Sequence, residues 1–192
     1  MRKLLIFVLL LGLCSVSFAT EKQVTEKQAA VQQAQKAGNV CYTENVDAVR
    51  GTSFPVKVFV SNVDTLAGMQ VPIYYRSEDI DLKCDSVTFT GSRCKDFALS
   101  FPMIEPVGKT VFFCFIYTTD ASQEVLPLLP GDGLVATLWF TAPKDIKAGP
   151  VTLESGPNAF YPHPKIDYGF LFWTPEAVQV DCAYKAGTIT VK

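Results

Sequence analysis

The chain holds one histidine, and any acid–base or nucleophilic chemistry that relies on imidazole must use it. His163 lies between Pro162 and Pro164, in a segment typical of a turn. A Ser–His–Asp or Cys–His arrangement would need this residue beside an activated nucleophile. The neighbouring sequence contains no nucleophile elbow, which favours a solvated loop histidine. The sequence therefore predicts that this protein is not an enzyme.

Acidic side chains that are close in the sequence are the next candidates for chemistry. They form three pairs: Glu78 with Asp79, Asp79 with Asp81, and Asp120 with Glu124. All lie in turn-like segments, where carboxylates usually accept hydrogen bonds from backbone N–H groups; glycoside hydrolysis instead needs two carboxyl groups facing each other across a cleft. Asp132, between Gly131 and Gly133, is expected to shape its own turn, because one short acidic turn supplies too few oxygens for calcium. The sequence predicts neither a metal site nor a cofactor.

The first 19 residues have the pattern of a secretion signal. A basic start is followed by an apolar run over residues 4–13 and by a small-x-small pattern that ends at Ala19. We expect cleavage after Ala19 and a secreted or periplasmic protein. The apolar run is too short to span a bilayer comfortably, so no membrane insertion is expected after signal removal. Cys14 leaves lipidation as an alternative, although Leu13 is larger than the residue such a site requires.

The mature chain is expected to hold one domain behind a short leader. Two of the 17 basic residues lie in the signal, so 15 basic and 19 acidic side chains remain and the net charge becomes 15 − 19 = −4. No basic stripe remains, which excludes nucleic acid as a partner. Residues 20–39 are rich in Gln, Ala, Lys and Glu and predict a linker or frayed helix. Residues 40–192 are predicted to form the domain.

Five cysteines would remain after export, in a compartment that permits disulfides. No Cys-x-x-Cys or Cys/His spacing indicates a metal site. One candidate pair is Cys41 with Cys182, which would join the first and last strands. The other is Cys84 with Cys94, a local pair, and Cys114 would then be left over. The spacing alone does not determine this connectivity.

One strand stands out because it is apolar on both faces. The run 131–140 opens with Gly131–Asp132–Gly133 and continues with period-2 alternation. One face carries Leu134, Ala136, Leu138 and Phe140, and the other carries Val135, Thr137, Trp139 and Thr141. A face exposed only to solvent would not need a tryptophan, so we expect the outer face to bind a partner. This pattern favours a recognition module.

From residue 40 onward the pattern is that of an all-β protein. Short alternating or apolar runs are separated by Gly, Pro, Asn and Asp. They cover residues 54–60, 69–75, 80–89, 97–101, 111–116, 133–140, 151–153, 169–173, 177–181 and 188–191. About nine strands without crossover helices predict an antiparallel two-sheet sandwich. Pro72 lacks a backbone donor, which places strand 68–75 at an edge or at a bulge.

Six segments occur in an order that resembles a known family. They are Gly51 with 54–60, then 66–75, 79–87, 109–118, 133–140 and 187–191. Their order and spacing resemble the cohesin family, extracellular jelly-roll domains that anchor dockerin modules, mostly in cellulose-degrading assemblies. The resemblance covers roughly residues 40–192 and implies a jelly-roll topology. Two departures are Arg76, where the family usually has Asp, and an enlarged excursion over 160–173.

The resemblance also implies a binding face. In cohesins the partner docks on a flat sheet face, here formed by strands 68–75, 96–103, 110–117 and 133–140. Taking the more uniformly apolar side chains as core leaves Pro72, Cys114 and Val135 pointing outward together with the predicted partner-binding residues. These are Gln70, Tyr74, Phe112, Ile116, Thr137 and Trp139. Trp and Tyr are typical interface anchors, so this surface is expected to bind a protein.

The family resemblance therefore implies a non-catalytic module that docks a dockerin-like protein in extracellular polysaccharide-degrading or cell-surface assemblies. One alternative is a carbohydrate-binding module in which Trp139, Tyr74 and Phe112 stack on sugar rings. Another is a structural surface or periplasmic subunit that self-associates. The excursion 160–173 offers a further alternative, because it would bury Trp139 if it folded over the sheet. Cys114 on this face is either a covalent handle or a small buried side chain.

Overall fold

The structure is a computed structural model that describes residues 38–118, 125–163 and 168–192. The predicted signal and nearly all of the predicted leader, as well as the Asp120–Glu124 pair, lie outside the described residues. The described part belongs to the compact unit Gly38–Lys192. Its regular structure consists of β-strands, as the alternating sequence predicted.

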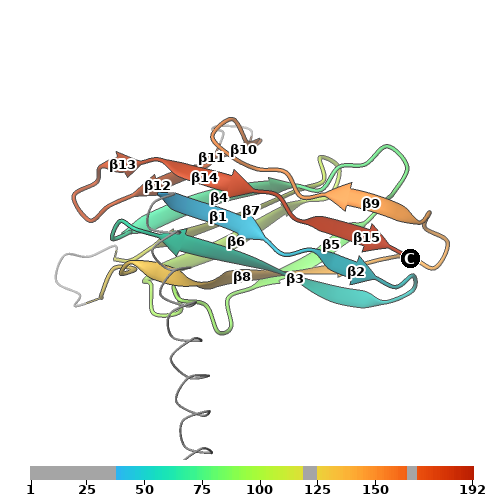
Figure 1. Cartoon of the computed structure of the whole chain (residues 1–192), viewed down its shortest axis with the longest axis horizontal. Helices are drawn as coiled ribbons and strands as arrows, with labels where there is room; N and C mark the ends of the chain where they lie inside the picture. The colour runs from blue at the N-terminus through green and yellow to red at the C-terminus, as the bar shows by residue number, and fades with distance from the viewer. Residues whose placement is uncertain (1–37, 119–124, 164–167) are drawn as a thin grey trace, which may run out of the picture. The chain divides into compact units, whose positions relative to one another are not determined.

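Two five-stranded sheets pack face to face (Figure 1). The first has the order β14-β1-β3-β8-β5, formed by Cys182–Lys185, Asn39–Thr43, Ser53–Asn62, Gly131–Thr141 and Lys83–Thr88. The second has the order β13-β12-β4-β7-β6, formed by Gln179–Val180, Leu171–Trp173, Gly68–Tyr74, Thr110–Ile116 and Leu99–Glu105. The predicted all-β sandwich is therefore confirmed.

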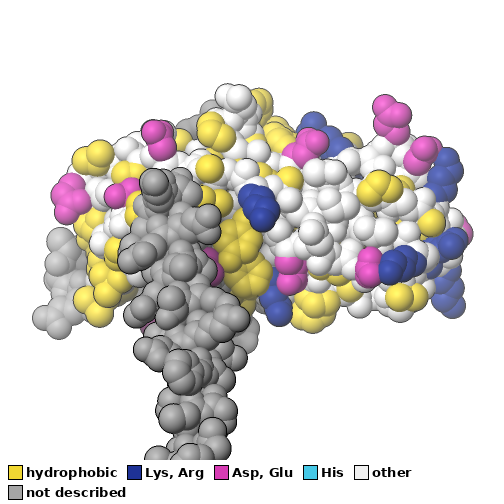
Figure 2. Space-filling view, in the orientation of Figure 1, with side chains coloured by type: hydrophobic (Ala, Val, Ile, Leu, Met, Phe, Trp, Pro, Cys, Tyr) yellow, Lys and Arg dark blue, Asp and Glu magenta, His cyan; other side chains and the backbone are white. Residues whose placement is uncertain are grey.

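Two smaller sheets complete the described chain. One has the order β2-β15-β9, formed by Val46–Ala48, Thr188–Val191 and Gly149–Thr152. The other is the hairpin of β10 (Phe160–Tyr161) and β11 (Tyr168–Gly169). In the view of Figure 2, charged side chains of both signs gather toward the end of the domain at which β2, β9 and β15 lie.

The core lies between the two large sheets and follows from strand alternation. Along β3, Phe54, Val56, Val58 and Val60 are buried. The ring of Tyr75, just after β4, meets Phe140 of β8 edge to face at 5.1 Å between centroids. Burying each such side chain contributes on the order of 2 kcal/mol.

Two strand pairs depart from the predicted antiparallel pattern. β1 pairs with β14 in parallel, and β2 pairs with β15 in parallel. The last two strands of the chain thus run beside the first two in the same direction. Period-2 alternation is the same in both kinds of ladder, so the sequence pattern could not distinguish them.

Pro72 sits where a strand can lack a donor. It pairs with Phe112 of β7 on one side, whereas the register of β12 against β4 ends at Gln70. At Pro72, β4 has no strand paired with it on the β12 side, so no backbone hydrogen bond on that side requires an N–H from the proline. The prediction that strand 68–75 lies at an edge or at a bulge is wrong, because β4 is the middle strand of its sheet and pairs with β7 through Pro72 without a register shift.

The predicted pairing of Cys84 with Cys94 is wrong. Cys84 lies opposite Phe140 of β8, whereas the N–H of Arg93 donates to the carbonyl of Leu134, six residues away along that strand. This separation is about 20 Å. A disulfide needs Cα atoms within about 7 Å. Both cysteines are buried free thiols.

The predicted pairing of Cys41 with Cys182 is not formed either, although the two residues are close. They lie on neighbouring strands, but Cys182 is in register with Asn39 and Cys41 with Tyr184. This two-residue offset puts their Cα atoms about 8 Å apart, just beyond disulfide reach. Both are free thiols in the structure.

Candidate functional site

The predicted partner-binding residues of strands 68–75 and 110–117 share one surface. β4 and β7 are antiparallel neighbours, with Gln70 opposite Cys114 and Gly68 opposite Ile116. Residues directly opposite each other point to the same side of a sheet. We call the outer side of β12, β4, β7 and β6 the β4–β7 face.

β6 adds three large apolar side chains that the sequence reasoning did not assign to this face. Leu99 lies opposite Ile116, Phe101 opposite Cys114, and Met103 opposite Phe112. All three are half-buried. Their period-2 spacing could have revealed them, but it did not show which side of the strand faces outward.

Part of this face is covered by the chain itself. The β10–β11 hairpin packs on it, with the ring of Tyr161 5.7 Å and that of Tyr168 4.9 Å from the ring of Phe112. The hydroxyl of Tyr74 donates to the carbonyl of Phe160. Phe112 is therefore 0% exposed. The prediction that Phe112 points outward is correct, but the prediction that it is open to a partner is wrong.

The covered part forms a small apolar cluster, separate from the sandwich core. Its buried members are Phe112, Cys114 and Tyr161. Burial raises the pKa of the Cys114 thiol to about 11, so this side chain is neutral at physiological pH. Burial, and then the nearby charge of Glu105, raise the pKa of Tyr161. Cys114 is thus a small buried side chain, one of the two roles considered for it.

The uncovered part of the β4–β7 face is an apolar strip. We call it the open strip; its half-buried members are Leu99, Phe101, Met103, Ile116 and Trp173. Trp173 pairs with Gly68, and a Cβ at Gly68 would overlap the indole ring. Glycine at position 68 therefore lets the tryptophan lie against the sheet. The sequence reasoning placed Trp173 in the excursion and did not predict this role.

Two predicted binding residues lie on the first sheet and not on the β4–β7 face. Thr137 and Trp139 are on β8, which lies in the first sheet between β3 and β5. The prediction that they share a face with Tyr74 and Phe112 is wrong, because strand order within sheets is set by contacts that alternation does not encode. The excursion covers Phe112 instead of Trp139, and Trp139 remains 39% exposed.

A β-bulge reverses part of the predicted alternation on β8. Val58 is opposite Ala136 and Phe59 is opposite Leu134, so Val135 is the extra residue. Val135 is fully buried and Leu134 only half-buried, the opposite of the prediction. Thr137, flanked by β3 and β5, is 9% exposed and offers a partner little surface.

Few of the described side chains at this face are of a kind that takes part in catalysis. Among residues 38–118, 125–163 and 168–192, no three His, Cys, Asp or Glu side chains are placed to hold a metal ion together. The ring of His163 lies 5.7 Å from that of Tyr168. The guanidinium of Arg76 sits over the ring of Tyr74 at 4.3 Å.

In the part of the chain that the structure describes, no helix is long and apolar enough to cross a membrane.

Comparisons with known proteins identify the fold. No family model and no curated protein sequence matches the chain. Among solved structures, a type I cohesin from Clostridium thermocellum, OlpC in complex with Doc435, matches with a TM-score of 0.62 and 17% identity over 81% of this chain and 94% of that one. The chain has the cohesin fold.

Other cohesins match over the same region. The cohesin CaCohA2 from Clostridium acetobutylicum matches with a TM-score of 0.60 and 18% identity, over 81% of this chain and 91% of its own. The seventh ScaB type I cohesin from Pseudobacteroides cellulosolvens matches with a TM-score of 0.60 and 16% identity, over 81% of this chain and 92% of its own. The resemblance to cohesins is therefore confirmed for the fold.

Proposed function

We propose that this chain is a non-catalytic docking module that binds a dockerin-like protein through the β4–β7 face. The observation that carries the proposal is the open strip, an uncharged row of large apolar side chains on a cohesin fold. Several cohesins with the same fold were solved in complex with dockerins.

The composition of the open strip fits a protein partner. Its members are aliphatic, aromatic and thioether side chains: Leu99, Phe101, Met103, Ile116 and Trp173. Cores of protein interfaces are enriched in aromatic residues and Met and depleted of charge. A few such anchors supply most of the affinity in typical interfaces. The β10–β11 hairpin borders the strip and would limit the partner to its uncovered side.

Charge placed in the open strip tests this proposal. Leu99 and Ile116 lie opposite each other, so Leu99→Lys and Ile116→Lys put an ammonium group at the same point of the strip. We expect each change to weaken binding to dockerin modules about tenfold or more, measured by isothermal titration calorimetry against a panel of dockerins. The buried ammonium would have no partner there.

Val107→Lys is the matched control, because Val107 is 92% exposed in the turn between β6 and β7. Its dockerin affinity should equal that of the unmodified chain, and urea unfolding should show all three variants folded. Equal dockerin binding by all three variants, or no binding of any dockerin by the unmodified chain, would refute the proposal.

We further propose that the module is exported and works outside the cytoplasm, in a polysaccharide-degrading or cell-surface assembly. The support is the basic-apolar-small pattern that ends at Ala19. Mass spectrometry of the protein secreted by its source should show Thr20 as the first residue. Dockerin-like duplicated calcium loops in exported proteins of the same organism would support the assembly; an intact N-terminus in the cytoplasm would contradict export.

A further inference from the structure

The outer side of the first sheet carries a second exposed aromatic site. Trp139 of β8 is 39% exposed, with Pro55 of β3 and Ser86 of β5 as its register partners. Its indole N–H donates to the hydroxyl of Thr88 at 3.4 Å, which directs the ring toward β5. The indole is thus anchored by one polar edge and leaves apolar surface to solvent.

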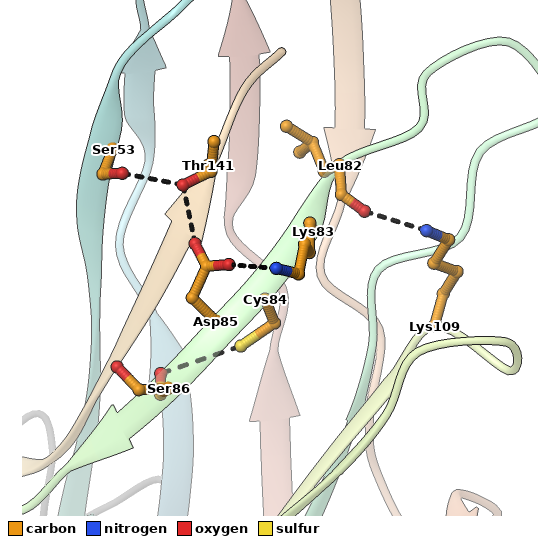
Figure 3. A network of polar contacts seen from close by, with 8 residues as sticks. All are labelled: Ser53, Leu82, Lys83, Cys84, Asp85, Ser86, Lys109 and Thr141. Carbon is orange, nitrogen blue, oxygen red and sulfur yellow. Dashed lines mark hydrogen bonds and ion pairs between the residues drawn. The ribbon is translucent and has the colours of Figure 1, made fainter.

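A row of polar side chains runs beside this indole. The hydroxyl of Ser53 bonds to that of Thr141 at 2.7 Å, and the Thr141 hydroxyl donates to the carboxylate of Asp85 at 2.6 Å. The ammonium of Lys83 lies 3.0 Å from the same carboxylate (Figure 3). Thr141 is two residues from Trp139 on β8, so the row and the indole share one side of the sheet.

The hydrogen bond from Thr141 and the adjacent Lys83 lower the pKa of Asp85. Asp85 is therefore ionised at neutral pH and retains free acceptor capacity. The row consequently offers hydroxyls, a carboxylate and an ammonium, which can donate to and accept from several hydroxyl groups at once.

We infer that Trp139 and the Ser53–Thr141–Asp85–Lys83 row form a carbohydrate-binding surface for an extended glycan chain. A pyranose ring has apolar C–H faces that stack on an indole and a rim of hydroxyls that bond to such a row. Between Thr88 and Lys83, β5 runs beside Thr137 to Thr141 of β8, about 13 Å, because one residue of β5 is bulged; this length fits an oligosaccharide.

The composition of this surface argues against a protein partner. Cores of protein interfaces are depleted of Lys, Asp and Ser, all of which border Trp139 here. The open strip has the opposite composition, without a charged or hydroxyl side chain. The two surfaces lie on different sheets, so glycan binding at Trp139 does not depend on the proposed docking at the β4–β7 face.

The chain has only two tryptophans, which makes the test direct. In a Trp173→Phe variant, Trp139 is the sole tryptophan. Titration with β-linked hexasaccharides of glucose, xylose and mannose should give a saturable change in its emission with at least one of them. Calorimetry with that sugar should show binding weakened about tenfold or more by Trp139→Ala and by Asp85→Asn.

Leu99→Lys serves as the control, because it alters the other sheet and should bind the sugar unchanged. Urea unfolding should show that all variants remain folded. The inference is overturned if none of the three sugars gives a saturable response, or if Trp139→Ala binds the sugar as tightly as the unmodified chain. It is also overturned if light scattering shows self-association that requires Trp139. Dockerin binding, measured on the same variants, reports separately on the β4–β7 face.

Discussion

Glycine at position 68 and tryptophan at position 173 form one structural unit. Gly68 pairs with Trp173 across β4 and β12, and the indole occupies the space that a side chain at position 68 would fill. The N–H of Ala67 also donates to the carbonyl of Trp173 at 2.8 Å. These two residues therefore determine how far the open strip extends toward β12.

Gly68→Ala tests this unit. The added methyl group would overlap ring atoms of Trp173, so we expect the free energy of unfolding to fall by about 1–3 kcal/mol. Trp173 should also move, which its fluorescence would report. Gly169→Ala is the control, because a Cβ there would lie at an ordinary 3.6 Å from Leu171. Equal stability of the two variants would show that the indole does not need the glycine.

The guanidinium of Arg93 forms a group of hydrogen bonds that joins two strands of the first sheet. One of its terminal nitrogens donates to the carbonyls of Val60 and Gly131 and to the side chain of Asn62, at 2.8–3.0 Å. The other donates to the carbonyl of Leu129 at 2.7 Å. The guanidinium thus connects the end of β3 to the start of β8. Partial burial lowers its pKa, but the group remains charged at neutral pH.

Removing this guanidinium should lower the free energy of unfolding. Arg93→Met leaves several backbone acceptors without a donor, so we expect a loss of about 2–4 kcal/mol in the free energy of unfolding, measured with urea. Arg76→Met is a comparison at an exposed site, where the guanidinium donates to the carbonyl of Gly108. That change should cost about 1 kcal/mol or less. Similar losses in the free energy of unfolding at both positions would contradict this role of Arg93.

At the scale of elements, the β10–β11 hairpin changes the surface of the second sheet. It turns Phe112 and Cys114 from surface positions of β7 into buried ones. The bulge in β8 has a comparable effect, because it exchanges the environments of Leu134 and Val135. Both features depend on one strand contacting another that is distant in the sequence.

Opening the hairpin should expose the thiol beneath it. In Tyr161→Ala, a buried ring that covers Phe112 is lost, so we expect stability to fall by about 2 kcal/mol. Cys114, which belongs to the same cluster, should react faster with iodoacetamide, as mapped by mass spectrometry. Phe160→Ala is the control, because Phe160 is the 47% exposed neighbour in the same strand. Unchanged labelling of Cys114 would show that the hairpin does not protect it.

At the scale of the whole domain, all five described cysteines are buried thiols. Burial is the main cause that raises the pKa values of Cys84, Cys94 and Cys182 to about 12, from the usual 9.0. The folded chain therefore favours the protonated thiols more strongly than the unfolded chain does.

This difference predicts alkaline instability. Below about pH 9 both states bind the thiol protons, so the stabilisation is complete; as the pH rises toward about 12 the unfolded chain loses them first and the stabilisation is lost. Urea unfolding should show a declining free energy of unfolding between about pH 9 and about pH 12. Tyr75, whose pKa burial raises to about 12, adds to the decline above pH 10. In Cys94→Ala the decline should be shallower, and a flat profile in the unmodified chain would contradict the prediction.

The sequence by itself determined the strand content and the outward direction of Phe112 and Trp139. These properties follow from alternation, which acts over a few neighbouring residues. The order of the apolar segments also indicated the cohesin fold, which the solved structures support.

Only the tertiary structure decided which strands share a sheet, and it separated Trp139 from Tyr74 and placed it between β3 and β5. It also decided that the hairpin covers Phe112, and that Cys84 and Cys94 lie beside distant parts of β8. The reason is physical: each of these outcomes depends on packing between residues far apart in the chain. Alternation constrains the side on which a residue lies, but not the strand that will lie beside it.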